Sequence, residues 1–186
     1  LIPDALKNAG FSNVSYVEKQ CIPDGDFPTV KSPNPEEKEA LKLGIDLMES
    51  QNGDLLIAND PDADRVGVAV KSDGKTVILN GNQIACILLN HICEGLTATH
   101  QMPKKAAFIK TIVTTELFKA IAKSYQTACF EVLTGFKYIA EKIREWEAAK
   151  GSPEYVFGAE ESYGYLYGTL VRDKDAISTT LLIMEA

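Results

Sequence analysis

Cationic residues, histidines and long apolar runs are scarce in this chain, and each shortage argues against a class of function. The 186 residues include 19 Lys and Arg against 26 Asp and Glu, which gives a formal net charge of −7 at pH 7. Because such a surplus of negative charge repels polyanions, we expect no nucleic acid partner and no membrane partner. No apolar run approaches the length of a membrane span, and no signal peptide is visible.

Paired cysteine motifs are also missing. The four cysteines show no Cys-x-x-Cys spacing and no pairing with the two histidines. This pattern favours reduced thiols in a cytoplasmic protein. Cys86 and Cys93 lie seven residues apart in an expected helix, so we expect both to face the core.

The composition is otherwise that of an ordinary globular protein. Hydrophobic residues make up 45% and charged residues 24% of the chain, and its length suits one large or two small domains. Residues 1–10 predict a helix that Gly10 ends, with no initiator Met, and residues 175–184 are typical of an unfinished helix. We therefore expect a fragment of a longer protein.

Short apolar runs alternate with segments of helical periodicity. Strands are expected at 14–17, 54–58, 66–71, 76–79, 106–112, 128–133 and 155–157. Helices are expected from Pro35, with Asn34 as N-cap, to near Gly53, and over 83–94, 115–125 and 137–149. The alternation predicts an α/β fold of two layered domains with mixed, largely parallel sheets, incomplete at both chain ends.

Three aspartates at alternate positions, Asp60, Asp62 and Asp64, fall between two of the apolar runs. Alternate side chains of an extended backbone point the same way, so the three carboxylates can converge. Like charges this close raise one another's pKa, and a bound hard cation is the usual compensation. Mg²⁺ prefers such oxygen ligands, and Arg65 adds a planar guanidinium suited to phosphate oxygens.

Two other interpretations of this acidic loop are weaker. A solvated acidic turn fits poorly because the cluster has no lysine and lies between two strands that look buried. An EF-hand needs Gly at its sixth position and Glu at its twelfth, and counted from Asp60 these positions hold Arg65 and Lys71.

Ligands of α/β sheets gather at the carboxyl ends of strands, so the residues found there matter most. Lys110, in the 106–112 segment, can face a phosphate or reach solvent, and composition alone favours solvent. Thr134 and Gly135 follow the 128–133 strand. Glycine permits a close backbone approach there, and Thr134 can instead be the N-cap of the next helix.

The segment 158–164 follows the 155–157 strand and holds Glu160 and Ser162 between glycines. A carboxylate and a hydroxyl placed in this way can hold sugar hydroxyls by paired hydrogen bonds. A solvated turn explains the same residues about equally well. Lys174, in an Arg-Asp-Lys-Asp run, adds a nearby cation or marks a charged helix start.

These motifs resemble those of the α-D-phosphohexomutase family, which includes phosphoglucomutases and phosphomannomutases. Asp60-Pro61-Asp62-Ala63-Asp64-Arg65 is similar to the family's metal loop and is the most specific of the motifs. Glu160-Glu161-Ser162 resembles its sugar-recognition loop. Thr134-Gly135-Phe136-Lys137 resembles a Thr-Gly-aromatic motif of phosphoglucomutases and their phosphopentomutase-like relatives. The motifs occur in family order, and the resemblance covers essentially the whole chain.

The resemblance implies a place for the chain in a larger enzyme. Family members have four domains around one cleft, and residues 1–74 would be the later part of the second domain and residues 75–186 most of the third. No Thr-Ala-Ser-His-Asn-like segment occurs, so the family's phosphoserine loop has no counterpart here, and neither does its fourth-domain phosphate-binding loop. The remaining domains of the parent chain are then its expected partners.

The resemblance also implies roles for single residues. Mg²⁺ would be held by Asp60, Asp62 and Asp64, with a phosphoserine oxygen as a further ligand, and Arg65 would lie against that phosphate. The other implied positions surround the sugar phosphate. Lys110 and Lys174 would be basic residues near the substrate, and Lys110 is also a candidate general base. Thr134 and Gly135 would line the cleft, and Glu160 and Ser162 would bind the ring hydroxyls.

The implied activity is that of a phosphohexomutase, which converts a sugar phosphate such as glucose 1-phosphate to glucose 6-phosphate through a phosphoserine. Hexose 1,6-bisphosphate would be the intermediate and the activator of the parent, and the fragment alone would be inactive. One alternative is a haloacid-dehalogenase-type sugar phosphatase with Asp62 or Asp64 as nucleophile, which Arg65 fits poorly. Another is a non-catalytic module that binds Mg²⁺ and sugar phosphate.

Overall fold

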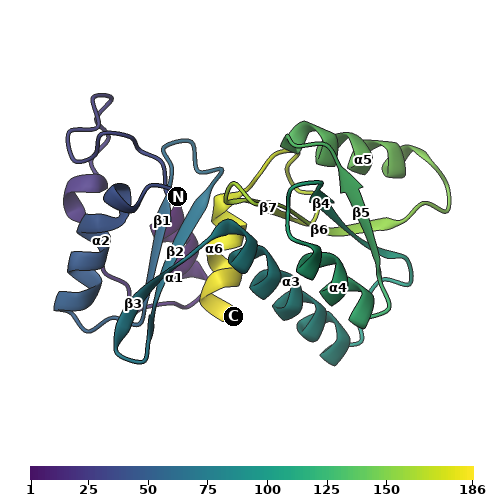
Figure 1. The fold of residues 1–186 in the computed structure, drawn as a ribbon, viewed down its shortest axis with the longest axis horizontal. Helices are drawn as coiled ribbons and strands as arrows, with labels where there is room; N and C mark the ends of the chain where they lie inside the picture. The colour runs from purple at the N-terminus through teal and green to yellow at the C-terminus, as the bar shows by residue number, and fades with distance from the viewer.

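The computed structural model describes residues 1–186 as two lobes, each built on its own sheet, with one helix between them (Figure 1). The first sheet is antiparallel, in the order β1-β2-β3. Its strands are β1 (Leu55–Asn59), β2 (Val66–Ser72) and β3 (Lys75–Leu79). Asp73 and Gly74 join β2 to β3 with φ of 49° and 73°, and such positive values suit a tight hairpin turn.

Helices complete the first lobe beside this sheet (Figure 1). They are α1 (Ile2–Asn8) and α2 (Lys38–Ser50), with a short 3₁₀ turn at Glu18–Gln20 between them. Gly44 of α2 lies so close to Leu56 of β1 that an added Cβ would collide with that side chain. This close approach brings α2 onto the sheet.

The second sheet is mixed, in the order β5-β4-β6-β7. Its strands are β4 (Ala106–Thr111), β5 (Ala128–Val132), β6 (Glu154–Glu160) and β7 (Gly164–Tyr167). β4 runs parallel to β5 and β6, and β7 returns antiparallel beside β6. Every residue of β4 is buried, as is typical of a parallel strand covered on both faces.

Helices cover both faces of the second sheet (Figure 1). They are α3 (Gly81–Ala98), α4 (Glu116–Ser124) and α5 (Phe136–Ala148). Neighbouring residues of β4 point to opposite faces. Phe108 joins the core formed with α3 and α4, and Ile109 joins the smaller core formed with α5.

The last helix, α6 (Ala176–Glu185), lies between the two lobes (Figure 1). One hydrophobic core of 18 buried residues passes beneath it and contains Val66 and Val68 of β2 together with Phe157 of β6. The lobes therefore share one core, which fixes the end of the first sheet against the second.

The structure confirms the expected α/β class, with its layered helices and mixed sheet, and it corrects several local predictions. Residues 14–17 form no strand, because Val14 and Val17 pair with neither sheet, and a strand needs a neighbour. The second helix begins at Lys38. Asn34 instead closes a turn, in which its Oδ1 accepts from the Glu36 backbone N–H at 3.0 Å.

The second lobe brings two further corrections. The short strand β7 was not expected, and it turns the segment after β6 into a hairpin. Gly135 and not Thr134 is the N-cap of α5. The division expected between residues 74 and 75 stays a prediction about domains, although β3 is hydrogen-bonded to β2 in one sheet. None of the helices has both the length and the apolar character needed to cross a membrane.

Candidate functional site

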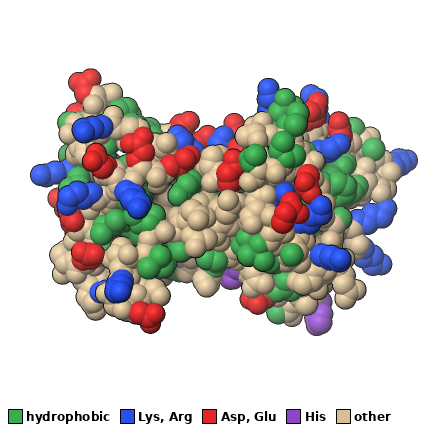
Figure 2. Space-filling view, in the orientation of Figure 1, with side chains coloured by type: hydrophobic (Ala, Val, Ile, Leu, Met, Phe, Trp, Pro, Cys, Tyr) green, Lys and Arg blue, Asp and Glu red, His purple; other side chains and the backbone are tan.

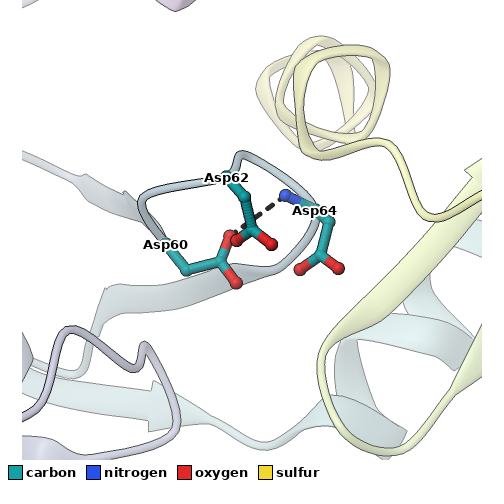
Figure 3. A group of neighbouring side chains, drawn as sticks. All are labelled: Asp60, Asp62 and Asp64. Atoms are coloured by element: carbon teal, nitrogen blue, oxygen red, sulfur yellow. Dashed lines mark hydrogen bonds between the residues drawn. The ribbon is translucent and has the colours of Figure 1, made fainter.

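The acidic loop between β1 and β2 brings three carboxylates to one point (Figure 3). One carboxylate oxygen from each of Asp60, Asp62 and Asp64 lies within 4.8 Å of the others. The loop starts and ends at the paired residues Asn59 and Val66, and it reverses through Ala63, whose φ is 55°. The convergence expected from alternate spacing is thus present, but a tight turn produces it and not an extended backbone.

Asp60 is the buried anchor of this loop and is only 5% exposed. Its Oδ1 accepts from the backbone N–H groups of Asp64 and Arg65, both at 3.0 Å, and its Oδ2 accepts from Arg65 Nε at 2.7 Å. Burial alone would raise the pKa of Asp60, but the hydrogen bonds from Arg65 and Asp64 outweigh it and lower the pKa. The turn is therefore held by a carboxylate that stays ionised.

Asp64 shows what the acidic loop lacks. Its Oδ2 pairs with Lys174 Nζ at 2.8 Å, whereas its Oδ1 is buried, accepts no hydrogen bond and has Arg65 Nε at 3.5 Å as its nearest cation. Burial is the main cause that raises the pKa of Asp64, Asp60 adds to it, and Lys174 opposes it. A buried oxygen without a partner is costly, and a hard cation among the three carboxylates would satisfy it. The donor set therefore fits Mg²⁺.

Arg65 is engaged within the protein on more than one side. Beside its bond to Asp60, its Nη1 donates to Asn34 Oδ1 at 3.2 Å and lies 3.6 Å from Glu36 Oε1. Asn34 and Glu36 were not singled out as site residues from the sequence. They lie about thirty residues upstream, where no local pattern connects them to the acidic loop.

Glu160 ends β6 and is the buried acid of the second loop, only 5% exposed. Its Oε1 accepts from the Gly135 backbone N–H at 2.7 Å. Burial raises the pKa of Glu160, and the bond from Gly135 opposes this effect. The structure thus brings Gly135 and Glu160 together. The two motifs to which they belong are far apart in the sequence, and they meet at the carboxyl ends of β5 and β6.

The acidic loop and the β6–β7 hairpin touch each other directly. The Val66 N–H donates to the Tyr163 carbonyl oxygen at 3.1 Å, and Arg65 forms a β-bridge with Gly164. The stem of Lys174 packs so closely on Gly164 that an added Cβ would collide with it. In Figure 2 acidic and basic side chains gather along the upper edge of the molecule, where it is hollowed between the lobes.

Lys110 is fully buried, which corrects the expectation from composition that it reaches solvent. Its ammonium group donates to the Thr114 carbonyl oxygen at 2.9 Å and lies 2.9 Å from Glu116 Oε1. Glu131 of the neighbouring strand lies at 3.8 Å. Lys110 therefore sits at the carboxyl end of β4 but is surrounded by acceptors of the protein itself.

Comparison with known protein families identifies the class of protein to which this fold and these loops belong. The model of the phosphoglucomutase/phosphomannomutase alpha/beta/alpha domain II matches residues 1–74, and the model of domain III of the same family matches residues 80–186. The chain belongs to the phosphoglucomutase/phosphomannomutase family.

Individual proteins agree with this assignment. The chain is 41% identical to a phosphoglucomutase of Staphylococcus haemolyticus over 186 residues, which cover 100% of this chain and 33% of that protein. The chain thus spans about a third of the length of this relative. The fold is similar to that of the open form of a Paramecium phosphoglucomutase, parafusin, with a TM-score of 0.64 at 20% identity over 98% of this chain and 30% of that one.

A more distant structure has the same fold and contains ligands. It is an N-acetylphosphoglucosamine mutase of Aspergillus fumigatus, solved in complex with GlcNAc-6P and magnesium. The TM-score is 0.53 at 15% identity, over 84% of this chain and 33% of that one. This similarity concerns the fold.

Proposed function

We propose that this chain supplies the metal-binding and sugar-binding loops of a phosphohexomutase, an isomerase that moves a phosphoryl group between two hydroxyls of a hexose phosphate. One observation carries the proposal: the acidic loop and the β6–β7 hairpin meet through the Val66–Tyr163 hydrogen bond. A cation site and a sugar-binding loop must lie this close for one small substrate to reach both. We also propose that the phosphoserine belongs to a longer parent chain.

Asp60, Asp62 and Asp64 would hold Mg²⁺ in this enzyme. The buried Oδ1 of Asp64, which accepts no hydrogen bond, supports the assignment, as does the magnesium of the Aspergillus relative. When bound, the metal neutralises charge on the phosphoryl group that is transferred. Asp60 contributes a carboxylate that is already ionised and oriented, so this ligand needs no loss of a proton before the cation binds.

Glu160 and Ser162 would hold the ring hydroxyls. Gly135 takes up only Oε1 of Glu160, which leaves Oε2 without a protein donor and able to accept from a sugar hydroxyl. Thr134 and Gly135 would line the same cleft. A carboxylate beside a hydroxyl can accept and donate in either orientation of the sugar, and a mutase must bind its substrate in two orientations.

The cations would face phosphate. Lys174 lies between the two loops, where its ammonium group pairs with Asp64 and Asp173. Arg65 would contact the phosphoserine by its guanidinium group, whose Nη1 is already fixed by Asn34. For Lys110 to act as general base, it must first part from Glu116, an exposed side chain that can move aside.

The four free cysteines suit the reducing conditions of the cytoplasm, where we propose that the protein acts on small sugar phosphates. Hexose 1,6-bisphosphate would activate the parent enzyme. These assignments follow from the proposed activity and stand or fall with it.

The experiment compares this chain with a parent that also carries the phosphoserine domain. With glucose 1-phosphate and glucose 1,6-bisphosphate, the chain alone should not form glucose 6-phosphate, whereas the parent should form it in the presence of Mg²⁺. Release of inorganic phosphate, with an aspartyl-phosphate mimic trapped by beryllium fluoride, would instead support the phosphatase. Binding of Mg²⁺ and sugar phosphate without turnover by either protein would support the binding module.

A further inference from the structure

We infer that Glu161 is a positioning residue, which fixes the hairpin loop 161–163 against the end of β4 and thereby aims Glu160 and Ser162 at the sugar. We call Glu161 together with Thr111 and Thr114 the threonine clamp. The kinetic part of this inference rests on the proposed function. Its structural part does not.

The threonine clamp consists of one carboxylate oxygen and two buried hydroxyls. Glu161 Oε2 accepts from Thr111 Oγ1 at 3.0 Å and from Thr114 Oγ1 at 3.1 Å, and the two hydroxyls lie 2.9 Å apart. These three oxygen–oxygen contacts share only two hydroxyl protons, so only two of them can be hydrogen bonds at one time. Either both threonines donate to Glu161, or one donates to Glu161 and the other donates to its neighbour.

Burial gives these hydrogen bonds their importance. Thr111 is 0% exposed and Thr114 is 2% exposed, so neither hydroxyl can turn to water. Without Glu161, at least one buried donor would lack an acceptor, which is costly. The acid therefore ties the loop after β6 to the end of β4 and the segment that follows it, across positions 50 and 47 residues apart in the sequence.

The loop that Glu161 belongs to has a strained backbone. Glu160 and Gly164 form the last β6–β7 pair, so only residues 161–163 make the reversal. Tyr163 takes φ of 66°, a region that aromatic residues rarely adopt. Such a conformation persists only where the surroundings hold it, and the Val66 N–H bond and the threonine clamp hold it from opposite ends.

The threonine clamp also reaches the neighbouring elements. The Thr115 backbone N–H donates to Asn82 Oδ1 at 2.9 Å, which fixes the start of α4 to the start of α3. Lys110 donates to the Thr114 carbonyl oxygen. Because Glu160 lies next to Glu161, a shift of the clamp would be passed directly to the residue that we assign to the sugar.

Hydrogen exchange of this chain tests the structural part. Glu161→Ala should speed exchange of the amides in 112–115 and 161–164 by about tenfold or more, while the core of β4 stays protected. Glu161→Gln keeps an acceptor and should remain within about threefold of wild type. Glu154→Ala is the matched control, since Glu154 is an exposed acid at the other end of β6.

The threonines provide a second test that leaves Glu161 in place. Thr111→Ser with Thr114→Ser keeps both hydroxyls, and Thr111→Val with Thr114→Val removes them. The valine pair should reproduce the fast loop exchange and the serine pair should not, so this comparison decides the matter if Glu161→Ala does not fold. Equal exchange in the two pairs would overturn the inference.

Kinetics of the proposed parent enzyme test the functional part. Glu161→Ala should raise KM for the sugar phosphate about tenfold and change kcat by less than about threefold, because it disturbs the binding loop and not the phosphoryl group. Glu161→Gln should recover most of the loss. An unchanged KM despite loosened loop exchange would overturn the aiming role. A parent without mutase activity would refute the proposed function, and exchange would still decide the structural role of Glu161.

Discussion

The acidic loop and the β6–β7 hairpin lie side by side but are organised in different ways. Asp60 holds the acidic loop through the backbone N–H groups of Asp64 and Arg65, at most five residues away. The hairpin depends on partners far along the chain: Gly135 for Glu160, and Thr111 with Thr114 for Glu161. The turn of the acidic loop is thus closed by its own residues, although Lys174 pairs with Asp64 and the Ala176 N–H donates to the Ala63 carbonyl oxygen from the far end of the chain. The hairpin carboxylates take their geometry from the assembled fold.

This difference separates the expected effects of mutations. A change of the exposed Asp62 should remove function and leave the fold intact, whereas a change of the buried Asp60 should also loosen the turn that it holds. Changes around the hairpin should affect binding and stability together, because the same contacts build the sheet and aim the side chains.

The largest effect is expected in the acidic loop. Asp62→Asn in the proposed parent should lower turnover by orders of magnitude, since the exposed carboxylate of Asp62 is a proposed metal ligand and carries little of the fold. Steady-state kinetics with Mg²⁺ measures the loss, and thermal unfolding should be nearly unchanged. Asp73→Asn, in the exposed β2–β3 turn, is the matched control. Near-normal turnover of Asp62→Asn would rule out the metal assignment.

A smaller loss is expected at the hairpin. Glu160→Ala in the parent should lower kcat/KM for hexose phosphate by about tenfold to a hundredfold, because a sugar hydroxyl loses a charged acceptor. Phosphorylation of the enzyme by a bisphosphate should suffer less than it does in Asp62→Asn. If kcat/KM were unchanged, the hairpin would be a surface turn without a part in sugar binding.

Two glycines of α3, only one of which touches the hairpin, allow its contribution to the free energy of unfolding to be measured. A Cβ on Gly81 would overlap the Glu161 carbonyl oxygen, so Gly81→Ala should cost about 1–3 kcal/mol of the free energy of unfolding. Gly95 has open space, and Gly95→Ala should stabilise the same helix by up to about 1 kcal/mol. Denaturant unfolding measures both changes. Equal effects would show that the hairpin does not press on α3.

The smallest effect is a dependence of stability on pH. The pKa of Glu160 is raised above its ordinary value of 4.5, mainly by burial, so the folded state binds more protons than the unfolded state between these two values. Stability from this group should therefore fall as pH rises through that window. Glu160→Gln, which keeps the acceptor for Gly135, should flatten this part of the curve in denaturant titrations. An unchanged slope would place the cause elsewhere.

Most of the secondary structure was predictable because it depends on the local periodicity of apolar residues and on turn residues. The β2–β3 turn follows from Asp73 and Gly74, and the buried face of α3 from Cys86 and Cys93. The absence of a strand at 14–17 was not predictable, because it depends on whether a neighbouring strand accepts the segment. β7 was missed for the reverse reason, since this short strand is stable only beside β6.

The candidate site divides in the same way. The convergence of Asp60, Asp62 and Asp64 was expected from their spacing, and they converge. The burial of Lys110 was not, because a lysine at a strand end looks the same in the sequence whether it meets solvent or acceptors. The part played by Glu161 could not be foreseen, since its partners are two ordinary threonines on another strand.

The sequence by itself determined the α/β layering, the family motifs and the acidic loop, because these depend on residues within a few positions of one another. Only the tertiary structure decided which loops meet, which acids are buried, and that Tyr163 is held in a strained conformation next to Val66. The physical reason is that hydrogen bonds across tens of residues form only once the core has brought distant strands, and in the case of Val66 and Tyr163 the two sheets, together.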